Sequence, residues 1–355
     1  MSRYGVYVHL PWCARRCHYC SFNVHVDPSR DEEAYTEAVL RQWETLREHF
    51  SGPPETLAFG GGTPSLHPPR LLGRLVDAIA PAGEISLEAN PESMNTDAWL
   101  ALGITRVSLG VQTFDPRQVR FLNRHRPEHA QRALEAVKRF PTWSVDLIFG
   151  LPDQELGDLD VELDRLLAHD PPHASLYGLT VHPGTAFSAA VARGQLQPAG
   201  DDRYVDLYER AAERLEDAGL ARYEVSNFAR VGHRSAHNLH YWTMRPYAGL
   251  GAGAHGLLPD GRRTVGTADP RAFIADPLDM LVETPTPDQV AVDQLLSCIR
   301  LREGTSSANF DEAVLAELAA AGLVAVDSHV RLVGPGWALA DAVTRRLASA
   351  IVEPS

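Results

Sequence analysis

The first two-thirds of the chain alternate short apolar runs with longer segments of helical periodicity. The short runs are rich in apolar and β-branched residues and lie at Tyr4–His9, Thr56–Phe59, Glu84–Glu88, Arg106–Gly110, Ser144–Phe149 and Ala174–Tyr177. Helical patterns separate them at residues 31–50, 70–79, 128–140 and 156–169. Strands that alternate with helices predict a parallel sheet covered by helices. The sequence therefore predicts an α/β fold, either an open sheet or a sheet curled into a partial (β/α)6 barrel.

The pattern changes near residue 285. Helical segments at 288–301, 310–321 and 337–350 then surround two short apolar runs, Leu323–Val326 and Val330–Val333. This order predicts a small winged-helix-like α+β domain. We therefore divide the chain into a barrel with flanking elements (1–236), a connector region (237–284) and a small C-terminal domain (285–355).

Cysteines, glycines and isolated polar residues follow the predicted strands. Cys13–Cys20 comes after the first strand, Gly60–Pro64 after the second, Glu88 ends the third, Gln112 follows the fourth and Asp146 lies in the fifth. Taken singly, these residues are as well explained by a tight turn, a strand end and a satisfied core carboxylate. The carboxyl ends of parallel strands meet at one edge, however, so together they predict one site.

Three of the four cysteines, Cys13, Cys17 and Cys20, fall within eight positions. The fourth, Cys298, lies in the pattern of a buried helix face and is expected to be a core thiol. Zinc would need a fourth ligand, which His25 could supply. A [4Fe-4S] cluster normally takes four cysteines, so three would leave one iron open for a ligand. The cluster is favoured because all candidate ligands lie on one loop.

Charge and hydropathy limit the compartment and the partners. The formal net charge of −13 argues against a general nucleic-acid binder, which needs clustered basic residues. The first apolar run is too short for a signal peptide, and no run approaches the ~18 apolar residues of a membrane span. We expect a cytoplasmic protein with reduced thiols that is not integral to the membrane. Peripheral membrane association and a homodimer stay open.

The motifs resemble a known superfamily. Cys-x3-Cys-x2-Cys with Tyr19 before the last cysteine, followed by Gly-Gly-Thr-Pro after the second strand, is similar to the radical S-adenosylmethionine (SAM) superfamily. Leu87–Pro91, Ser108–Phe114 and Val145–Asp153 extend the resemblance, in order, to its coproporphyrinogen-III-oxidase-like branch. The resemblance covers nearly the whole chain. It implies a [4Fe-4S] cluster whose open iron is chelated by SAM.

The resemblance also implies two sets of ligands. Three thiolates hold the cluster, those of Cys13, Cys17 and Cys20. Residues from several strand ends bind SAM, namely Tyr7, Tyr19, Gly61, Gly62, Thr63, Glu88, Gln112, Arg124 and Asp146. Among them, the backbone of the glycine turn is expected on the methionine part, Glu88 on its ammonium and Arg124 on its carboxylate. Gln112 and Asp146 are expected on the ribose, and the two tyrosines at the adenosyl group.

Two functions compete within this branch. One is an oxygen-independent coproporphyrinogen III oxidase, which decarboxylates propionate side chains; the other is a heme chaperone of the HemW type, without that activity. Phe22 stands where the oxidases carry a further cysteine, and because only three residues precede the first predicted strand, we expect no counterpart of their amino-terminal arm. His237–Trp242 resembles the His-Asn-x-x-Tyr-Trp motif of the chaperones. The resemblance thus implies heme as a ligand, and heme-accepting respiratory proteins as partners.

His237 and Tyr241 are the candidate heme-binding residues of this motif. The segment is rich in imidazoles, which are common axial ligands of heme iron. The alternative interpretation is a capped turn followed by aromatic core residues. The sequence leaves both interpretations open.

Overall fold

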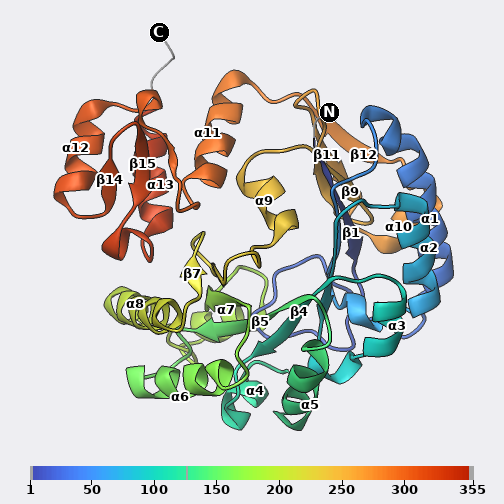
Figure 1. The fold of residues 1–355 in the computed structure, drawn as a ribbon, viewed down its shortest axis with the longest axis horizontal. Coiled ribbons are helices and arrows are strands. Elements are labelled where there is room, and N and C mark those ends of the chain that lie inside the picture. The colour runs from blue at the N-terminus through green and yellow to red at the C-terminus, as the bar shows by residue number, and fades with distance from the viewer. Residues whose placement is uncertain (1–2, 125–126, 352–355) are drawn as a thin grey trace.

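A computed structural model describes residues 3–124 and 127–351, and a 12-stranded sheet dominates the fold (Figure 1). Six neighbouring parallel strands form its centre, in chain order: β1 (Gly5–Leu10), β2 (Thr56–Gly61), β3 (Glu84–Ala89), β4 (Arg106–Gln112), β5 (Thr142–Phe149) and β6 (His173–Gly178). They correspond to the six predicted strands. The predicted α/β class and the parallel sheet are confirmed.

Helices follow these strands and cover the outside of the sheet. They are α1 (Glu32–Leu46), α2 (Pro69–Ile79), α3 (Thr96–Ala101), α4 (Pro116–Phe121), α5 (Pro127–Val137) and α6 (Leu156–Leu167), followed after β6 by α7 (Ala186–Ala192) and α8 (Asp201–Asp217). Local signals fix their starts: the Asp31 carboxylate accepts a hydrogen bond from the peptide N–H of Ala34 and caps α1. Fully buried side chains such as Val8, Leu57 and Leu87 form the core between sheet and helices.

The sheet continues beyond both edges of its parallel centre. Next to β1 runs β9 (Tyr247–Leu250), also parallel, and then β10 (His255–Leu257), β11 (Arg263–Gly266) and β12 (Met280–Glu283) add in antiparallel order. Next to β6 lie β8 (Asn227–Ala229) and β7 (Ala221–Arg222). The segment expected as a connector, 237–284, therefore contributes four strands, most of α9 (Ala236–Trp242) and α10 (Pro270–Ala275). These strands were not predicted.

The C-terminal segment forms a small α+β unit beside the barrel (Figure 1). It contains α11 (Pro287–Cys298), β13 (Thr305–Ser306), α12 (Glu312–Ala320), β14 (Val324–Val326), β15 (His329–Leu332) and α13 (Ala340–Ala348), with strand order β13-β15-β14. The guanidinium of Arg222 lies 4.7 Å from the ring centre of Trp337, and Arg300 pairs with the buried Glu224. In the part of the chain that the structure describes, no helix is long and apolar enough to cross a membrane.

A buried ion pair ties α9 to the amino-terminal ends of the barrel strands. Arg106 Nε donates to Glu84 Oε2 at 2.7 Å, and one terminal nitrogen of Arg106 donates to the carbonyl oxygens of His233 and Arg234, both at 2.9 Å. Glu84 also accepts a hydrogen bond from the peptide N–H of His237 at 3.1 Å. The pair thus fixes where α9 begins.

We expect Arg106→Ala to lower the free energy of unfolding by about 3–5 kcal/mol, because it leaves the Glu84 charge buried without its partner. Urea unfolding followed by circular dichroism measures the change. Arg3→Ala is the matched control: it breaks the exposed pair with Glu55 (3.3 Å) and should cost less than about 1 kcal/mol. Equal costs for the two variants would show that the buried pair does not anchor α9.

Candidate functional site

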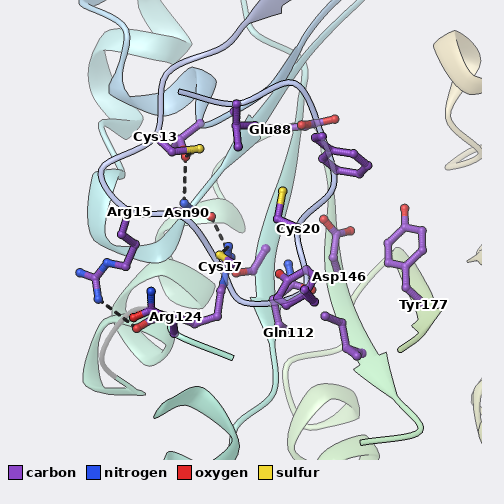
Figure 2. A pocket seen from close by; sticks show the side chains of 18 of the residues that line it. Cys13, Arg15, Cys17, Cys20, Glu88, Asn90, Gln112, Arg124, Asp146 and Tyr177 are labelled. Atoms are coloured by element: carbon purple, nitrogen blue, oxygen red, sulfur yellow. Dashed lines mark hydrogen bonds between the residues drawn. The ribbon is translucent and has the colours of Figure 1, made fainter. Parts of the chain in front are cut away.

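The three clustered cysteines lie on the loop between β1 and α1, at the carboxyl end of the barrel (Figure 2). Backbone hydrogen bonds close the base of this loop: the N–H of His25 donates to the carbonyl of Pro11 (2.7 Å), and the N–H of Cys13 to the carbonyl of His25 (2.9 Å). Inside the loop, the N–H of Cys20 donates to the carbonyl of Cys17 (3.2 Å). The loop is therefore a closed structure that presents three thiols to one cavity.

The thiols of Cys13, Cys17 and Cys20 are half-buried and line a cavity of about 440 Å³. The Thr63 hydroxyl donates to Cys13 Sγ at 3.4 Å, and a terminal nitrogen of Arg124 donates to Cys17 Sγ at 3.5 Å. Burial raises the pKa of Cys13 and of Cys20, so without metal these two thiols are protonated at neutral pH. Metal binding must displace these protons, and the surrounding donors then stabilise the thiolates.

The donor arrangement distinguishes the two metal chemistries. Structural zinc needs four ligands around one ion. Among the described residues, no group of three His, Cys, Asp or Glu side chains is placed to hold a single ion, and His25 Nε2 is hydrogen-bonded to Asn23 Oδ1 at 3.1 Å. In a [4Fe-4S] cluster, by contrast, each thiolate ligates a different iron, so the sulfurs surround the cavity instead of meeting at one point. The geometry therefore favours the cluster.

The glycine turn after β2 packs directly against the cysteine loop. Gly61 has φ of 112°, a conformation that favours glycine. A Cβ on Gly62 would lie 2.7 Å from the carbonyl carbon of Pro11 and from the carbonyl oxygen of Trp12. The peptide N–H groups of Gly62 and Thr63 donate to carbonyls of β1 and of the loop, at 2.9 and 2.8 Å. Gly61, Gly62 and Thr63 all line the cavity. The peptide N–H groups of Gly62 and Thr63 are already bonded to carbonyls of β1 and of the cysteine loop, so they hold the loop in place.

Two carboxyl groups line the cavity from β3 and β5, Glu88 with its side chain accessible from the cavity and Asp146 half-buried. Two effects raise the pKa of Glu88 to about 7: first the loss of solvation inside the protein, and second the negative charge of the nearby Asp146. A hydrogen bond from the Gly61 N–H at 3.3 Å acts in the opposite direction and lowers the pKa. Burial likewise raises the pKa of Asp146 to about 6, against a hydrogen bond from Ser108 at 2.9 Å. A cation in the cavity would stabilise both carboxylates and lower these pKa values. The pair is therefore suited to a ligand that carries an ammonium group.

Arg124 supplies the opposite charge. One terminal nitrogen donates to the Gly110 carbonyl at 2.6 Å and to Asn90 Oδ1 at 2.8 Å. Its Nε is buried and has no hydrogen-bond partner within the described part of the chain. A buried cationic donor without an acceptor indicates a site for an anionic group, and a carboxylate matches the planar guanidinium. The three thiols, the carboxyl groups and this arginine together fit a cluster with a chelating amino acid.

Gln112 reaches the cavity through an irregularity at the end of β4. The pairing of β4 with β5 shifts register between Gly110 and Gln112, and Gln112 has φ of 70°. Bulges and left-handed non-glycine residues are concentrated at functional sites, where they re-aim a side chain. Gln112 lines the cavity as predicted, although its contact with the ribose stays a prediction.

The two predicted tyrosines lie at different depths. Tyr19 lines the cavity, and burial raises its pKa. Tyr7 is not among the cavity-lining residues in the described chain; its hydroxyl is hydrogen-bonded to His9 Nδ1 at 2.9 Å. A Cβ on Gly60 would lie 2.7 Å from the Tyr7 ring, so this ring supports the glycine turn from inside the barrel. Adenosyl contacts of both tyrosines stay predictions.

The structure does not bring His237 and Tyr241 to the cavity. His237 Nδ1 is hydrogen-bonded to Thr56 Oγ1 (2.7 Å) and Nε2 to the Tyr241 hydroxyl (2.6 Å), while the His237 side chain is only 2% exposed. Burial lowers the pKa of His237 to about 3. Because Thr56 begins β2, this cluster lies at the opposite end of the strands from the cysteines. The heme-binding role of both residues stays a prediction.

Asn90 and Tyr177 are among the cavity residues that the sequence analysis did not single out. The side-chain nitrogen of Asn90 donates to Thr63 Oγ1 at 3.2 Å while its oxygen accepts from Arg124, so Asn90 connects the turn to the guanidinium (Figure 2). Tyr177 lines the cavity opposite the cysteines and is 43% exposed. Both lie at the carboxyl ends of predicted strands, the third and the sixth. Their position at a strand end is the only feature of the sequence that could have indicated a place in the cavity.

Comparisons with known proteins identify the family of the chain. The family model of the Radical SAM superfamily matches residues 7–166. The mouse protein named radical S-adenosyl methionine domain-containing protein 1, mitochondrial, is 40% identical over 73% of this chain, and the match spans 62% of that protein's length. A Mycobacterium tuberculosis protein named heme chaperone HemW is 36% identical over 97% of this chain and 94% of its own length.

Among solved structures, coproporphyrinogen III oxidase (HemN) from Escherichia coli covers 98% of this chain and 90% of its own, with a TM-score of 0.82 and 20% identity. This likeness establishes the common fold. The superfamily implies a [4Fe-4S] cluster and SAM, which is the chemistry that the thiols, carboxyl groups and Arg124 fit. The chain belongs to the radical SAM superfamily, in the branch that contains the proteins named heme chaperone HemW.

Proposed function

We propose that the protein is a heme chaperone that binds a [4Fe-4S] cluster, SAM and heme and transfers heme to acceptor proteins. The observation that carries the proposal is the 36% identity, along 97% of the chain, to a protein named heme chaperone HemW. The oxidase of the same fold is only 20% identical. Heme-accepting respiratory proteins are the proposed recipients and the cytoplasm the proposed compartment, where four unpaired cysteines stay reduced.

In this proposal the cavity binds and orients SAM. The thiolates of Cys13, Cys17 and Cys20 would hold the cluster, which, when bound and reduced, supplies an electron to SAM. Arg124 would bind the methionine carboxylate through its unpaired Nε, and Glu88, once deprotonated, would accept hydrogen bonds from the methionine amino group. The peptide N–H groups of Gly62 and Thr63 hold the cysteine loop beside these groups.

The second candidate function is coproporphyrinogen III oxidase, which the common fold favours. Phe22 argues against it: this side chain follows the third cysteine where the oxidases carry a further cysteine, and it is 67% exposed at the edge of the cavity. We expect no coproporphyrinogen decarboxylation by the cluster-loaded protein with reductant and SAM. Product analysis by chromatography tests this, with an active oxidase as positive control, and robust turnover would reverse the ranking.

We expect His237→Ala to weaken heme binding while the iron-sulfur cluster stays intact. Both ring nitrogens are engaged and the ring is buried, so we assign the effect to the position of α9 and Tyr241, not to direct ligation of the heme iron. Heme titration, followed at the Soret band after cluster content has been matched, gives the affinity and the iron-ligand spectrum.

Tyr241→Phe distinguishes the two roles. It removes the hydrogen bond to Nε2 but keeps the imidazole. If His237 positions α9, Tyr241→Phe also weakens heme binding, and His237→Ala shifts the affinity without changing the Soret wavelength. If His237 ligates the iron, Tyr241→Phe frees Nε2 and binds heme at least as tightly as the wild type, and His237→Ala changes the spectrum. Unchanged affinity in both variants would contradict any role of the motif in heme binding.

A further inference from the structure

The large sheet ends in a strand with an unpaired edge. This strand, β12, has β11 on one side, and the sheet ends on its other side (Figure 1). Just before β12, the Asp279 carbonyl accepts a hydrogen bond from the N–H of Thr267 at 3.4 Å, on the side of β11. Because the backbone groups of a strand alternate in direction, those of Met280 and Val282 point away from β11. No hydrogen bond from a loop or turn reaches these groups in the described chain.

Apolar side chains are exposed along the same edge. Leu281 is 60% exposed and Val282 45%, and Leu278, just before the strand, is also exposed. Successive side chains of a strand point to opposite faces of the sheet, so Leu281 lies on one face and Val282 on the other. An extended segment that paired with β12 would therefore gain backbone hydrogen bonds and would cover apolar side chains on both faces.

The edge is acidic. Residues 272–299 contain five Asp or Glu residues and no Lys or Arg. Asp276 and Asp279 are exposed and have no cationic partner within the described ranges, whereas Glu283 is paired with Arg263 at 3.1 Å. Unpaired carboxylates beside an open strand attract a basic segment and repel an acidic one.

The same charges oppose pairing of β12 with a second copy of the chain. If two copies paired antiparallel about Leu281, Asp279 of each would lie opposite Glu283 of the other, and like charges in opposite positions are destabilising. Pro277 and Pro285 flank the strand and donate no backbone hydrogen bond, which limits pairing to the short segment between them. The edge therefore disfavours association with itself but accepts a basic strand.

We propose that β12 binds a basic, apolar, extended segment of a partner protein, which adds to the sheet as the strand next to β12. The segment carries Lys or Arg near Asp276 and Asp279 and apolar residues beside Leu281 and Val282. None of the cavity-lining residues in the described chain comes from β12. The inference thus goes beyond the proposed function and depends on neither the cluster nor heme.

The test titrates the full chain with a fluorescein-labelled peptide of alternating Lys and Val, seven residues long, and follows fluorescence anisotropy. A second peptide has the same side chains but carries methyl groups on alternate backbone nitrogens, so one of its edges cannot donate hydrogen bonds. We expect the unmodified peptide to bind and the methylated peptide to bind about tenfold or more weakly. Equal affinity of the two peptides would overturn the proposal, and this comparison needs no protein variant.

Two substitutions at one position locate the bound strand. Val282→Pro removes an N–H that points away from β11, so it leaves the pairing with β11 in place and should weaken peptide binding about tenfold. Val282→Thr is the matched control, because it keeps the N–H and the branched side chain, and its affinity should stay within about twofold of wild type. Circular dichroism verifies that both variants are folded. Wild-type affinity in folded Val282→Pro would contradict binding at this edge.

A pair of charge variants tests the basic character of the partner. Asp276→Asn combined with Asp279→Asn should weaken peptide binding and reduce its salt dependence. The control is Asp206→Asn combined with Asp217→Asn, which removes two exposed carboxylates of α8 that also have no cationic partner in the described part of the chain. Equal weakening by both double variants would show a nonspecific effect of net charge and overturn the proposal.

Sedimentation of the full chain at several concentrations tests the competing occupant. Dimerisation that Val282→Pro abolishes, without peptide binding to the wild type, would show that a second copy occupies the edge and would overturn the proposal. The titrations are made with metal-free and with cluster-loaded protein, and equal affinities are expected. Peptide binding retained by a protein that fails to bind heme would contradict only the proposed function.

Discussion

Replacing Cys13, Cys17 or Cys20 with alanine is expected to abolish iron binding after anaerobic reconstitution, whereas Cys298→Ala should bind close to four irons per chain. The three thiols line one cavity, and in the proposed cluster each would supply the ligand of a different iron. Loss of any one leaves two protein ligands, too few to hold the cluster. Iron and sulfide analysis with optical spectra measures the loss.

Cys298 is the matched control because it ends α11, outside the cavity lining of the described chain. It is half-buried and, like Cys13 and Cys20, has a pKa raised by burial. Cys298→Ala therefore removes a thiol of similar burial and pKa without changing any residue that lines the cavity. Stoichiometric zinc in place of iron, or loss of iron in Cys298→Ala, would contradict the assignment.

The affinity for SAM is expected to fall about tenfold per pH unit below pH 7 and to level off above it. Burial raises the pKa of Glu88 to about 7 in the free protein, so below this pH the carboxyl group is protonated. A carboxylate is needed to accept hydrogen bonds from the amino group of SAM, so the proton on Glu88 must leave. Higher pH therefore favours binding until Glu88 is ionised, and near pH 7 binding should release a fraction of a proton.

Glu88→Gln keeps the shape of the side chain but removes its charge. We expect this variant to bind SAM at least about tenfold more weakly at pH 8 and to lose the pH dependence between pH 6 and 8. Titration calorimetry in two buffers of different ionisation enthalpy measures both affinity and proton release, with iron content matched. A wild-type affinity that stays constant from pH 6 to 8 would show that Glu88 does not bind the ammonium group.

Much of the site could be predicted because parallel strands bring distant residues to one edge. Glu88, Gln112 and Asp146 are spread over three predicted strands, and the rule that their carboxyl ends meet was enough to place them together with the cysteines. Asn90 and Tyr177 obey the same rule. Their side chains give no chemical signal in the sequence, so only the contact of Asn90 with Arg124 and the place of Tyr177 in the cavity show their relevance.

The role of Gly62 could not be predicted from its motif. The sequence suggests glycines with free peptide donors, whereas a Cβ on Gly62 would collide with the backbone of Pro11 and Trp12. A substitution there moves the cysteine loop as well as the pocket, so it does not isolate SAM binding. Contacts between two loops far apart in the chain leave no local pattern.

The four strands beyond β1 were missed for a related reason. β9 is only four residues long, contains a glycine and pairs with β1 across more than 200 residues of sequence, as in the register of Gly5 with Tyr247. Short glycine-containing strands carry little propensity of their own and are stabilised by their neighbours. The sequence therefore indicated a connector where the sheet continues. The burial of His237 could not be predicted either, because its hydrogen-bond partner Thr56 lies on a strand far away in the sequence.

The most direct test of the account is the electron paramagnetic resonance spectrum of the reduced, reconstituted protein with and without SAM labelled with ¹⁵N and ¹⁷O in its methionine part. The account predicts a [4Fe-4S] signal that changes on addition of SAM and shows hyperfine coupling to the labelled amino nitrogen and carboxylate oxygen, because one iron lacks a cysteine ligand. A cluster signal that SAM leaves unchanged, without coupling to either label, would contradict it.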